Sequence, residues 1–238
     1  ITNSTGVIRP ALFEMITAPI AGSSPVWSDA SQNGPRNLSF IGSDGFRHWG
    51  YITSVTSASQ ANCYIYDQAP MPDSNFNRFW QMGVYNKGNG FPRSTCFHQD
   101  RLGLAGAANY PQQIDASQTG SYELFSASGS SLQVSDNNAL QFRLLSEQSN
   151  PIMWVKSAAQ GLLAGSLSAE WQVSPNTQAQ GLTPTNVNAS ATSYFGSADV
   201  EAVQAGNATL YVQRALRKIR EMNFFFQVGT FRSTDLTE

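Results

Sequence analysis

Short runs of β-branched and aromatic residues recur along most of this chain, and clusters of Gly, Pro, Asn, Asp and Ser separate them. Such runs predict strands joined by tight turns, because these side chains pack well on a pleated surface. A strand signal about every ten residues favours a sandwich, a barrel or a propeller. The sequence therefore predicts an all-β fold of antiparallel meanders with little helix. The expected strands include residues 38–41, 49–55, 63–66, 79–85, 94–97, 101–106, 121–125, 140–145, 152–155, 162–164 and 170–173.

Helical periodicity is weak, and only residues 135–145 and 210–221 are candidates for helices. In the second candidate, Leu210, Arg214 and Glu221 are spaced like helix neighbours, but Val212 and Arg214 also share one face of a strand. Periodicity alone leaves both structures open. The β-forming residues on either side favour a strand pair that turns near Ala215 and Leu216.

The chain divides by composition into three parts. Residues 1–36 form a loop-rich segment with Pro10, Pro19, Pro25 and Pro35, which separate short apolar stretches. Residues 37–78 predict a small β-module followed by a Pro-rich linker, and residues 79–238 predict a larger β-domain. The chain begins at Ile1 without a methionine, and we expect either a fragment of a longer protein or a processed product.

Charged residues make up only 13% of the chain, against about 25% in a typical globular protein. Neutral polar residues replace them, and desolvating a neutral amide or hydroxyl costs less than desolvating an ion. This composition is typical of extracellular proteins and of subunits in large assemblies. The net charge of -2 predicts no bulk attraction to nucleic acid. No apolar run approaches the ~18 residues of a membrane span, so membrane insertion is not expected.

A basic cluster stands out because the chain is otherwise poor in charge. Arg214, Arg217, Lys218 and Arg220 fall within seven positions. Three interpretations are open. The cluster is a solvated strand face with ion pairs to Glu221 or Glu201, a contact with another subunit, or a contact with a nucleic-acid backbone, which needs only Lys and Arg on one face.

The basic cluster is followed by three consecutive phenylalanines, Phe224, Phe225 and Phe226. Side chains alternate between the two faces of a strand, so three in a row cannot all point to one side. We therefore expect this run to be buried on both faces, between two layers of the protein.

Motifs for common enzyme chemistry are absent. The chain has no GxSxG elbow, phosphate loop, HExxH motif or dinucleotide fingerprint. His98 could pair with Asp100, but two alternate residues on one strand face would be equally near, and we expect a structural role. No catalytic residue, metal site or cofactor is expected.

A carbohydrate-active protein is the alternative from a different functional class. Asp199 and Glu201 are the only close pair of acids before the C-terminal stretch, and paired carboxylates about 5–9.5 Å apart hydrolyse glycosides. Trp side chains can stack on sugars, although in all-β proteins they more often pack in the core. Cys63 and Cys96 match no metal-binding spacing, and two buried free thiols are favoured over a disulfide between them. The five tryptophans are Trp27, Trp49, Trp80, Trp154 and Trp171.

Many short motifs in the second part of the chain follow one order, and together the chain resembles tail proteins of short-tailed bacteriophages. The similar family is that of tubular tail or nozzle proteins, also described as phage stabilisation or virion structural proteins. The resemblance covers residues 79–238, and WGYI at 49–52 resembles the small β-module that precedes it. The motifs are FPR at 91–93, HQDRL at 98–102, NYPQ at 109–112, ASQTG at 116–120, YELF at 122–125, ALQF at 139–142, IMW at 152–154, EW at 170–171, LTP at 182–184, LYVQR at 210–214, RK at 217–218 and REM at 220–222.

The resemblance implies a virion structural protein of the phage tail with no enzymatic activity. Members of the family have β-propeller-like blades, form a ring-shaped homo-oligomer below the portal, contact portal, adaptor and other tail proteins, and enclose a channel for double-stranded DNA. Two departures are visible. Relatives tend to carry a Gly-Gly turn where this chain has Ala215 and Leu216, and they are usually much longer.

Overall fold

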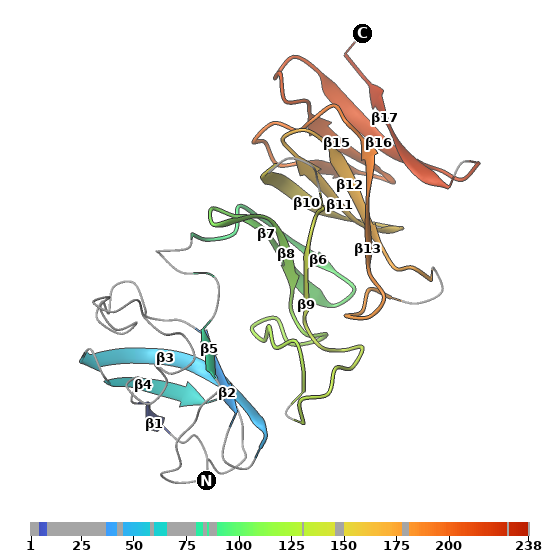
Figure 1. The fold of residues 1–238 in the computed structure, drawn as a ribbon. Coiled ribbons are helices and arrows are strands. Elements are labelled where there is room, and N and C mark those ends of the chain that lie inside the picture. Colours follow the sequence, from blue (N-terminus) through green and yellow to red (C-terminus); the bar gives the residue numbers. More distant parts are fainter. Residues whose placement is uncertain are drawn as a thin grey trace. The chain divides into compact units, whose positions relative to one another are not determined.

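The computed structural model describes residues 5–8, 37–41, 45–57, 60–65, 80–82, 85, 90–129, 131–145, 150–177, 181–227 and 229–237. The chain divides into two compact units, one of residues 1–90 with 128–133 and the other of residues 91–127 with 134–238. Every regular element in the described ranges is a β-strand (Figure 1). The all-β class is therefore confirmed.

The first unit contains a five-stranded antiparallel sheet in the order β1-β4-β3-β2-β5. Its middle strands β2, β3 and β4 are consecutive in the chain and form the expected meander. The two edge strands come from segments that composition assigned elsewhere, β1 from the loop-rich segment and β5 from the larger β-domain. The strands are β1 (Thr5–Ile8), β2 (Asn37–Ile41), β3 (Arg47–Ser57), β4 (Gln60–Ile65) and β5 (Trp80–Met82).

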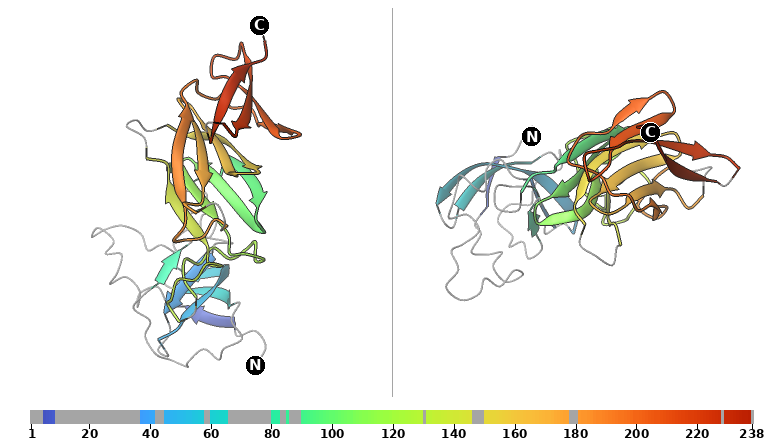
Figure 2. Two further views of the ribbon diagram at one scale, coloured as in Figure 1. Left: turned by 90° about the vertical axis from the view of Figure 1, so that its right-hand side faces the viewer. Right: turned by 90° about the horizontal axis from the view of Figure 1, so that it is seen from above.

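The second unit contains three four-stranded sheets, and each is an antiparallel meander in chain order. Figure 2 shows the three sheets following one another along the unit. The first sheet consists of β6 (Ser94–His98), β7 (Arg101–Ala107), β8 (Tyr110–Ala116) and β9 (Leu140–Arg143). The second consists of β10 (Ile152–Ala158), β11 (Gly161–Ser166), β12 (Glu170–Ser174) and β13 (Asn188–Ser193). The third consists of β14 (Val203–Ala205), β15 (Ala208–Val212), β16 (Ile219–Phe225) and β17 (Thr230–Asp235).

Two local predictions in this unit are wrong. Residues 121–125 form turns and coil, because Leu124 bonds back to Ser121 and the Tyr122 hydroxyl turns to the carboxylate of Asp100. Residues 135–145 do not form a helix. Asn138 closes a turn by accepting the backbone N–H of Ser135, and β9 follows it.

The second sheet is buried on both of its faces. Leu162 and Ala164 on β11 pack into a core shared with the first sheet, whereas Leu163 packs into a core shared with the third. All six residues of β11 are buried, as expected for a strand that is covered from both sides. Trp154 on β10 lies in the second core with no exposed surface. Two neighbouring sheets therefore stabilise the central one by apolar burial.

Gly165 on β11 allows this close packing. A Cβ atom at this position would fall inside van der Waals contact with the indole of Trp154 and the hydroxyl of Ser197. Both of these side chains are completely buried, so neither has space to move away. The position therefore requires glycine for reasons of space.

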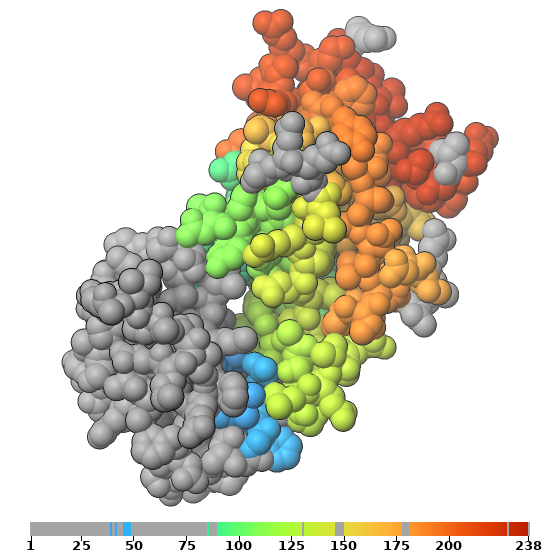
Figure 3. All heavy atoms as spheres, in the orientation of Figure 1, coloured from blue at the N-terminus to red at the C-terminus, as the bar shows by residue number. Residues whose placement is uncertain are grey.

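The three sheets are stacked with the same chain direction. Arg93, just before β6, donates to the sulfur of Met153, and His98, at the end of β6, bonds Ser157 near the end of β10. The first strands of the first and second sheets, β6 and β10, thus run side by side. The sheets form an open series of propeller-like blades that do not close into a ring. Figure 3 shows the third sheet, in orange-red to red, at the surface of this unit.

The prediction that the phenylalanine run is buried on both faces is wrong. Phe224 is half-buried against Phe231, with ring centroids 5.2 Å apart. Phe225, on the opposite face of β16, is 40% exposed, and Phe226 is 83% exposed. The physical reason is position, since β16 ends at Phe225 and Phe226 enters the following turn. Among the described residues no further sheet covers the outer face of β16.

The strand pair predicted for the basic segment is confirmed, and the helical alternative is wrong. Strands β15 and β16 pair antiparallel, and the turn between them spans residues 213–218. Leu216 in this turn has a φ of 58°, in the left-handed region that glycine adopts most readily.

Candidate functional site

The four residues of the basic cluster lie in three different environments. Arg214 and Arg217 are exposed in the turn between β15 and β16, Lys218 is ion-paired, and Arg220 on β16 is buried. We refer to residues 213–218 as the basic turn. The four residues are close together in sequence. Alternation of side chains along β16 and contacts with β17 nevertheless place them in different environments.

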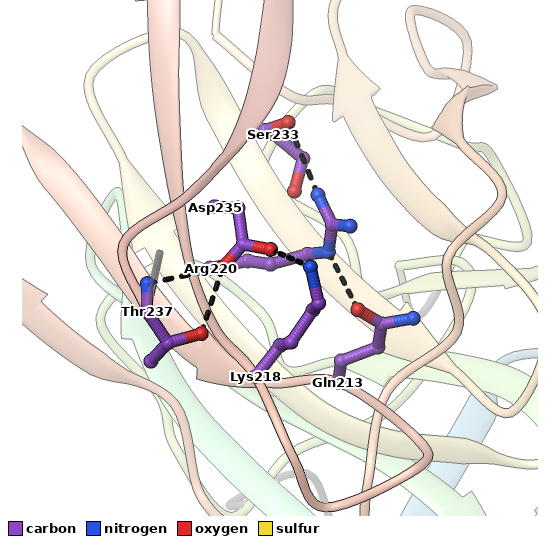
Figure 4. A network of polar contacts seen from close by, with 6 residues as sticks. All are labelled: Gln213, Lys218, Arg220, Ser233, Asp235 and Thr237. Atoms are coloured by element: carbon purple, nitrogen blue, oxygen red, sulfur yellow. Dashed lines mark hydrogen bonds and ion pairs between the residues drawn. The ribbon is translucent and has the colours of Figure 1, made fainter.

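The side chain of Arg220 is held by contacts within the third sheet and the basic turn (Figure 4). Its guanidinium lies 3.4 Å from the ring centroid of Phe195, and its Nε donates to Oε1 of Gln213 at 2.9 Å. It also donates to the backbone carbonyl of Ser233 at 3.5 Å. A stacked and hydrogen-bonded guanidinium ties the turn to β17 and to the segment before β14. It is not presented to an external ligand.

Lys218 forms an ion pair with Asp235 at the end of β17 (Figure 4). The carboxylate of Asp235 also accepts the backbone N–H and the hydroxyl of Thr237 at 3.0 and 2.8 Å. The Lys218 ammonium and these two donors hold the pKa of Asp235 well below its usual value. The ion pairs that were expected between the basic cluster and Glu221 or Glu201 therefore have other partners. The carboxylate of Glu221 accepts a hydrogen bond from Asn223, and Glu201 forms an ion pair with Lys156.

Arg214 and Arg217 are the two exposed cations of the cluster that form no ion pair with a described residue. Neither side chain makes an ion pair or hydrogen bond with any residue in the described ranges. The backbone N–H of Arg214 donates to the carbonyl of Gly196 at 2.9 Å, which places the basic turn beside the segment leading to β14. In that segment Tyr194 is 79% exposed, and Leu216 in the turn is also exposed. Exposed arginines and exposed apolar side chains therefore occur in the basic turn and in the segment beside it.

A buried carboxylate, Glu170, stabilises the segment that lies beside the basic turn. Glu170 begins β12 and accepts hydrogen bonds from the hydroxyls of Ser193 and Ser197 at 2.5 and 3.2 Å. It also accepts the backbone N–H of Phe195 at 3.3 Å. Burial raises the pKa of Glu170 above its usual value, and these bonds offset the shift only in part. No sequence motif marks this residue, because its partners come together only in the folded chain.

The acids Asp199 and Glu201 are not a free carboxylate pair. Asp199 forms an ion pair with Arg93 at 3.5 Å, and Glu201 forms one with Lys156 at 2.6 Å. Glu201 also accepts the hydroxyl of Ser94 at 3.4 Å. These contacts join the start of the third sheet to the first strands of the other two sheets. We refer to this side of the unit as the first-strand edge, and its acids are paired one to one with bases.

His98 pairs with a serine instead of with Asp100. Its Nδ1 lies 2.8 Å from Oγ of Ser157, whereas Asp100 accepts the hydroxyl of Tyr122 at 2.6 Å. Burial lowers the pKa of His98, so the imidazole is neutral at pH 7. In the described part of the chain no acid orients its second ring nitrogen, which is buried without a partner. A serine and a histidine without that third group lack the arrangement of a hydrolytic triad.

Two of the five tryptophans are placed in the core. Trp154 and Trp171 are buried, and Nε1 of Trp171 donates to the hydroxyl of Ser166 at 3.2 Å. The side chains of Trp27, Trp49 and Trp80 lie outside the described residues. Neither tryptophan that can be described presents a face to a sugar.

Cys96 is a free, half-buried thiol on β6. Burial raises its pKa to about 11, so it is protonated at neutral pH. The side chain of Cys63 lies outside the described residues. The described part of the chain contains no group of three or more His, Cys, Asp or Glu side chains that could hold a metal.

No described helix has the length and apolar character needed to cross a membrane. A comparison of the sequence with models of protein families finds no match. A comparison with curated proteins finds no match either.

Proposed function

We propose that this chain is a virion structural protein of a bacteriophage tail, a ring-forming nozzle or tubular subunit below the portal. The observation that carries the proposal is the second sheet, which is covered on both faces by sheets of the same meander topology and chain direction. A series of stacked four-stranded sheets is the architecture of a propeller-like subunit. The ordered motifs that resemble the tail family fall within this series.

The first-strand edge supports a role beside passing DNA. In a propeller-like arrangement the first strands lie nearest the axis, and here the charges of Asp199 and Glu201 are balanced by Arg93 and Lys156. Unpaired cations would bind phosphates and slow the genome, because each phosphate contact adds salt-dependent affinity. A wall with balanced charges lets double-stranded DNA pass with little retention.

The proposed protein acts by assembly and geometry and is not an enzyme. Its partners are further copies of itself in a ring, together with portal, adaptor and other tail proteins, and its location is the virion. The low fraction of charged residues suits extensive contacts between subunits, since few ions have to be desolvated.

Negative-stain electron microscopy of the purified chain tests the proposal directly. We expect ring-shaped or tail-like particles, with a mass by light scattering that is a multiple of the 25.8 kDa chain. A monomer at every concentration, combined with hydrolysis of a glycan that is lost in an Asp199→Asn or Glu201→Gln variant, would refute it. That result would establish the carbohydrate-active alternative, which the paired acids and the buried tryptophans do not favour.

A further inference from the structure

The third sheet has one face buried against the second sheet and one face that no described sheet covers. Alternation along the strands separates the two faces. Met222 on β16 and Phe231 on β17 are buried in the core shared with the second sheet, so their neighbours Glu221 and Arg232 point the other way. We call the face with Glu221 and Arg232 the outer face of the third sheet.

Apolar side chains lie on both sides of these charges on the outer face. Val203 on β14 is opposite Leu210 on β15, and Val212 on β15 is opposite Ile219 on β16, so these four form a continuous group across three strands. Val203 is 60% exposed and Ile219 is 45% exposed. Phe225 is exposed at the other end of β16. Scattered apolar residues are common on protein surfaces, but a contiguous group is typical of an interaction site.

The two charged residues of the outer face have opposite signs and are not paired with each other. Glu221 and Arg232 occupy neighbouring strands, and neither forms an ion pair with a described residue. The carboxylate of Glu221 accepts a hydrogen bond from Asn223, and the guanidinium of Arg232 lies 5.6 Å from the ring centroid of Phe225. These contacts orient both groups without neutralising their charges. The nearby Lys218 and Asp235 neutralise each other.

We infer that the outer face of the third sheet docks onto the same face of a second copy about a twofold axis. An axis parallel to the face and midway between Glu221 and Arg232 exchanges the positions of these two residues. Arg232 of each copy then lies opposite Glu221 of the other, so the dimer contains this ion pair twice. A face that carries both charges in this way is complementary to itself.

The same axis also brings the apolar side chains of the two copies together. The register of the third sheet and the usual spacing of strands fix where each side chain falls. Phe225 of one copy faces Val203 and Leu210 of the other. The strands of the two sheets cross steeply, as in orthogonal sheet packing. One operation therefore matches both the charges and the apolar groups.

A second copy fits the outer face better than other partners do. A DNA backbone would be repelled by Glu221, and a partner of a single charge would match only one of the two residues. The threonines and the asparagine on this face are neutral, so their desolvation costs less than that of ions. The inference goes beyond the proposed function and does not depend on it, because a twofold contact closes after two copies, whereas a ring needs two different surfaces. The neutral residues are Asn223, Thr230 and Thr234.

Reversal of the two charges tests the contact. Arg232→Glu places two acids opposite each other in the dimer, and Glu221→Arg places two bases opposite each other. We expect each variant to dimerise at least about tenfold more weakly than the wild type in sedimentation velocity at about 0.05 M salt. The double variant restores opposite charges and should dimerise like the wild type. An equal mixture of the two single variants should also recover the dimer.

The apolar part of the contact has its own variant and control. Val203→Ser should weaken the dimer at least about tenfold, because this side chain is buried twice in each dimer. Leu145, which is exposed after the last strand of the first sheet, lies outside the outer face, and Leu145→Ser should dimerise like the wild type. Circular dichroism shows whether each variant is folded.

The possible results separate the inference from the proposed function. If the wild type is monomeric at every concentration, something other than a second copy covers the outer face and the inference is wrong. If folded reversal variants associate as tightly as the wild type, or the double variant does not recover the dimer, the inference is also wrong, and rings that persist in these variants leave the proposed function standing. If the wild type forms dimers that depend on Glu221 and Arg232 but no rings, the inference holds and the proposed ring is refuted.

Discussion

Replacing Gly165 with alanine should destabilise the second unit strongly, although it adds only one methyl group. The new Cβ would overlap the indole of Trp154 and the hydroxyl of Ser197, and both side chains are completely buried. Overpacking of a filled core costs about 1–3 kcal/mol, and two immobile neighbours place this site near about 3 kcal/mol. The backbone of Gly165 is not in the left-handed region, so the cost is one of space alone.

Gly103 on β7 provides the matched control. A Cβ there would meet Sγ of the half-buried Cys96 at 3.2 Å and the carbonyl oxygen of Cys96 at 3.4 Å, and the closer atom, the sulfur, can shift by rotation of the side chain. Because alanine is also less flexible than glycine in the unfolded chain, Gly103→Ala should change the free energy of unfolding by about 1 kcal/mol or less. Urea denaturation followed by far-ultraviolet circular dichroism measures both variants.

A double-mutant cycle identifies the overlapping partner. Trp154→Phe shrinks the side chain and also removes an indole N–H that has no partner among the described residues. The Trp154→Phe protein should therefore accept the methyl group that Gly165→Ala adds, with a coupling free energy of at least about 1 kcal/mol between the two sites. A Gly165→Ala protein within about 1 kcal/mol of the wild type, or strictly additive effects in the cycle, would refute the packing of the central sheet on its neighbour.

Three further predictions concern single side chains. Leu216→Gly should raise the free energy of unfolding, or change it by less than about 0.5 kcal/mol, because glycine relieves the strain of the left-handed backbone. Leu216→Val should lower the free energy of unfolding by about 1 kcal/mol, and urea denaturation measures both variants. The raised pKa of Glu170 means that the folded state binds its proton more tightly, so stability from this group rises as the pH falls from neutral towards the ordinary Glu pKa. Glu170→Gln should remove this rise in thermal melts across pH 4–7, and an unchanged profile would contradict it. Phe226→Ser should change the unfolding free energy by less than about 0.5 kcal/mol, because its ring is 83% exposed. Phe231→Ser, in the core, should cost several times more in the same denaturation experiment.

The strands that could be predicted from sequence are those with a strong local pattern. The β-formers around Ala215 and Leu216 predicted the correct hairpin, although Leu216 occupies a conformation that its own side chain disfavours. Pairing with β14 and β17 overrides that preference. Residues 121–125 were predicted as a strand but form turns. The Tyr122 hydroxyl donates to the carboxylate of Asp100, a contact from outside the segment that its local pattern does not show.

The candidate site was predictable only as a cluster of residue types. Sequence placed Arg214, Arg217, Lys218 and Arg220 together, but it did not indicate that they would lie in different environments. It could not show that Arg220 stacks on Phe195, because that residue belongs to the segment after β13. No sequence pattern indicated a role for Glu170, because the hydroxyl and backbone N–H groups that donate to its carboxylate come together only in the folded chain.

The sequence by itself determined the all-β class, the antiparallel meanders and the basic hairpin, because hydrophobic alternation and turn residues act over short distances along the chain. Only the tertiary structure decided which faces are covered and which cations of the basic cluster are paired with described residues. Sheet stacking joins residues about a hundred positions apart, as in the contact between Arg93 and Asp199, and local patterns carry no information about such pairs. The same limit explains the phenylalanine run, whose burial depends on whether another sheet covers β16.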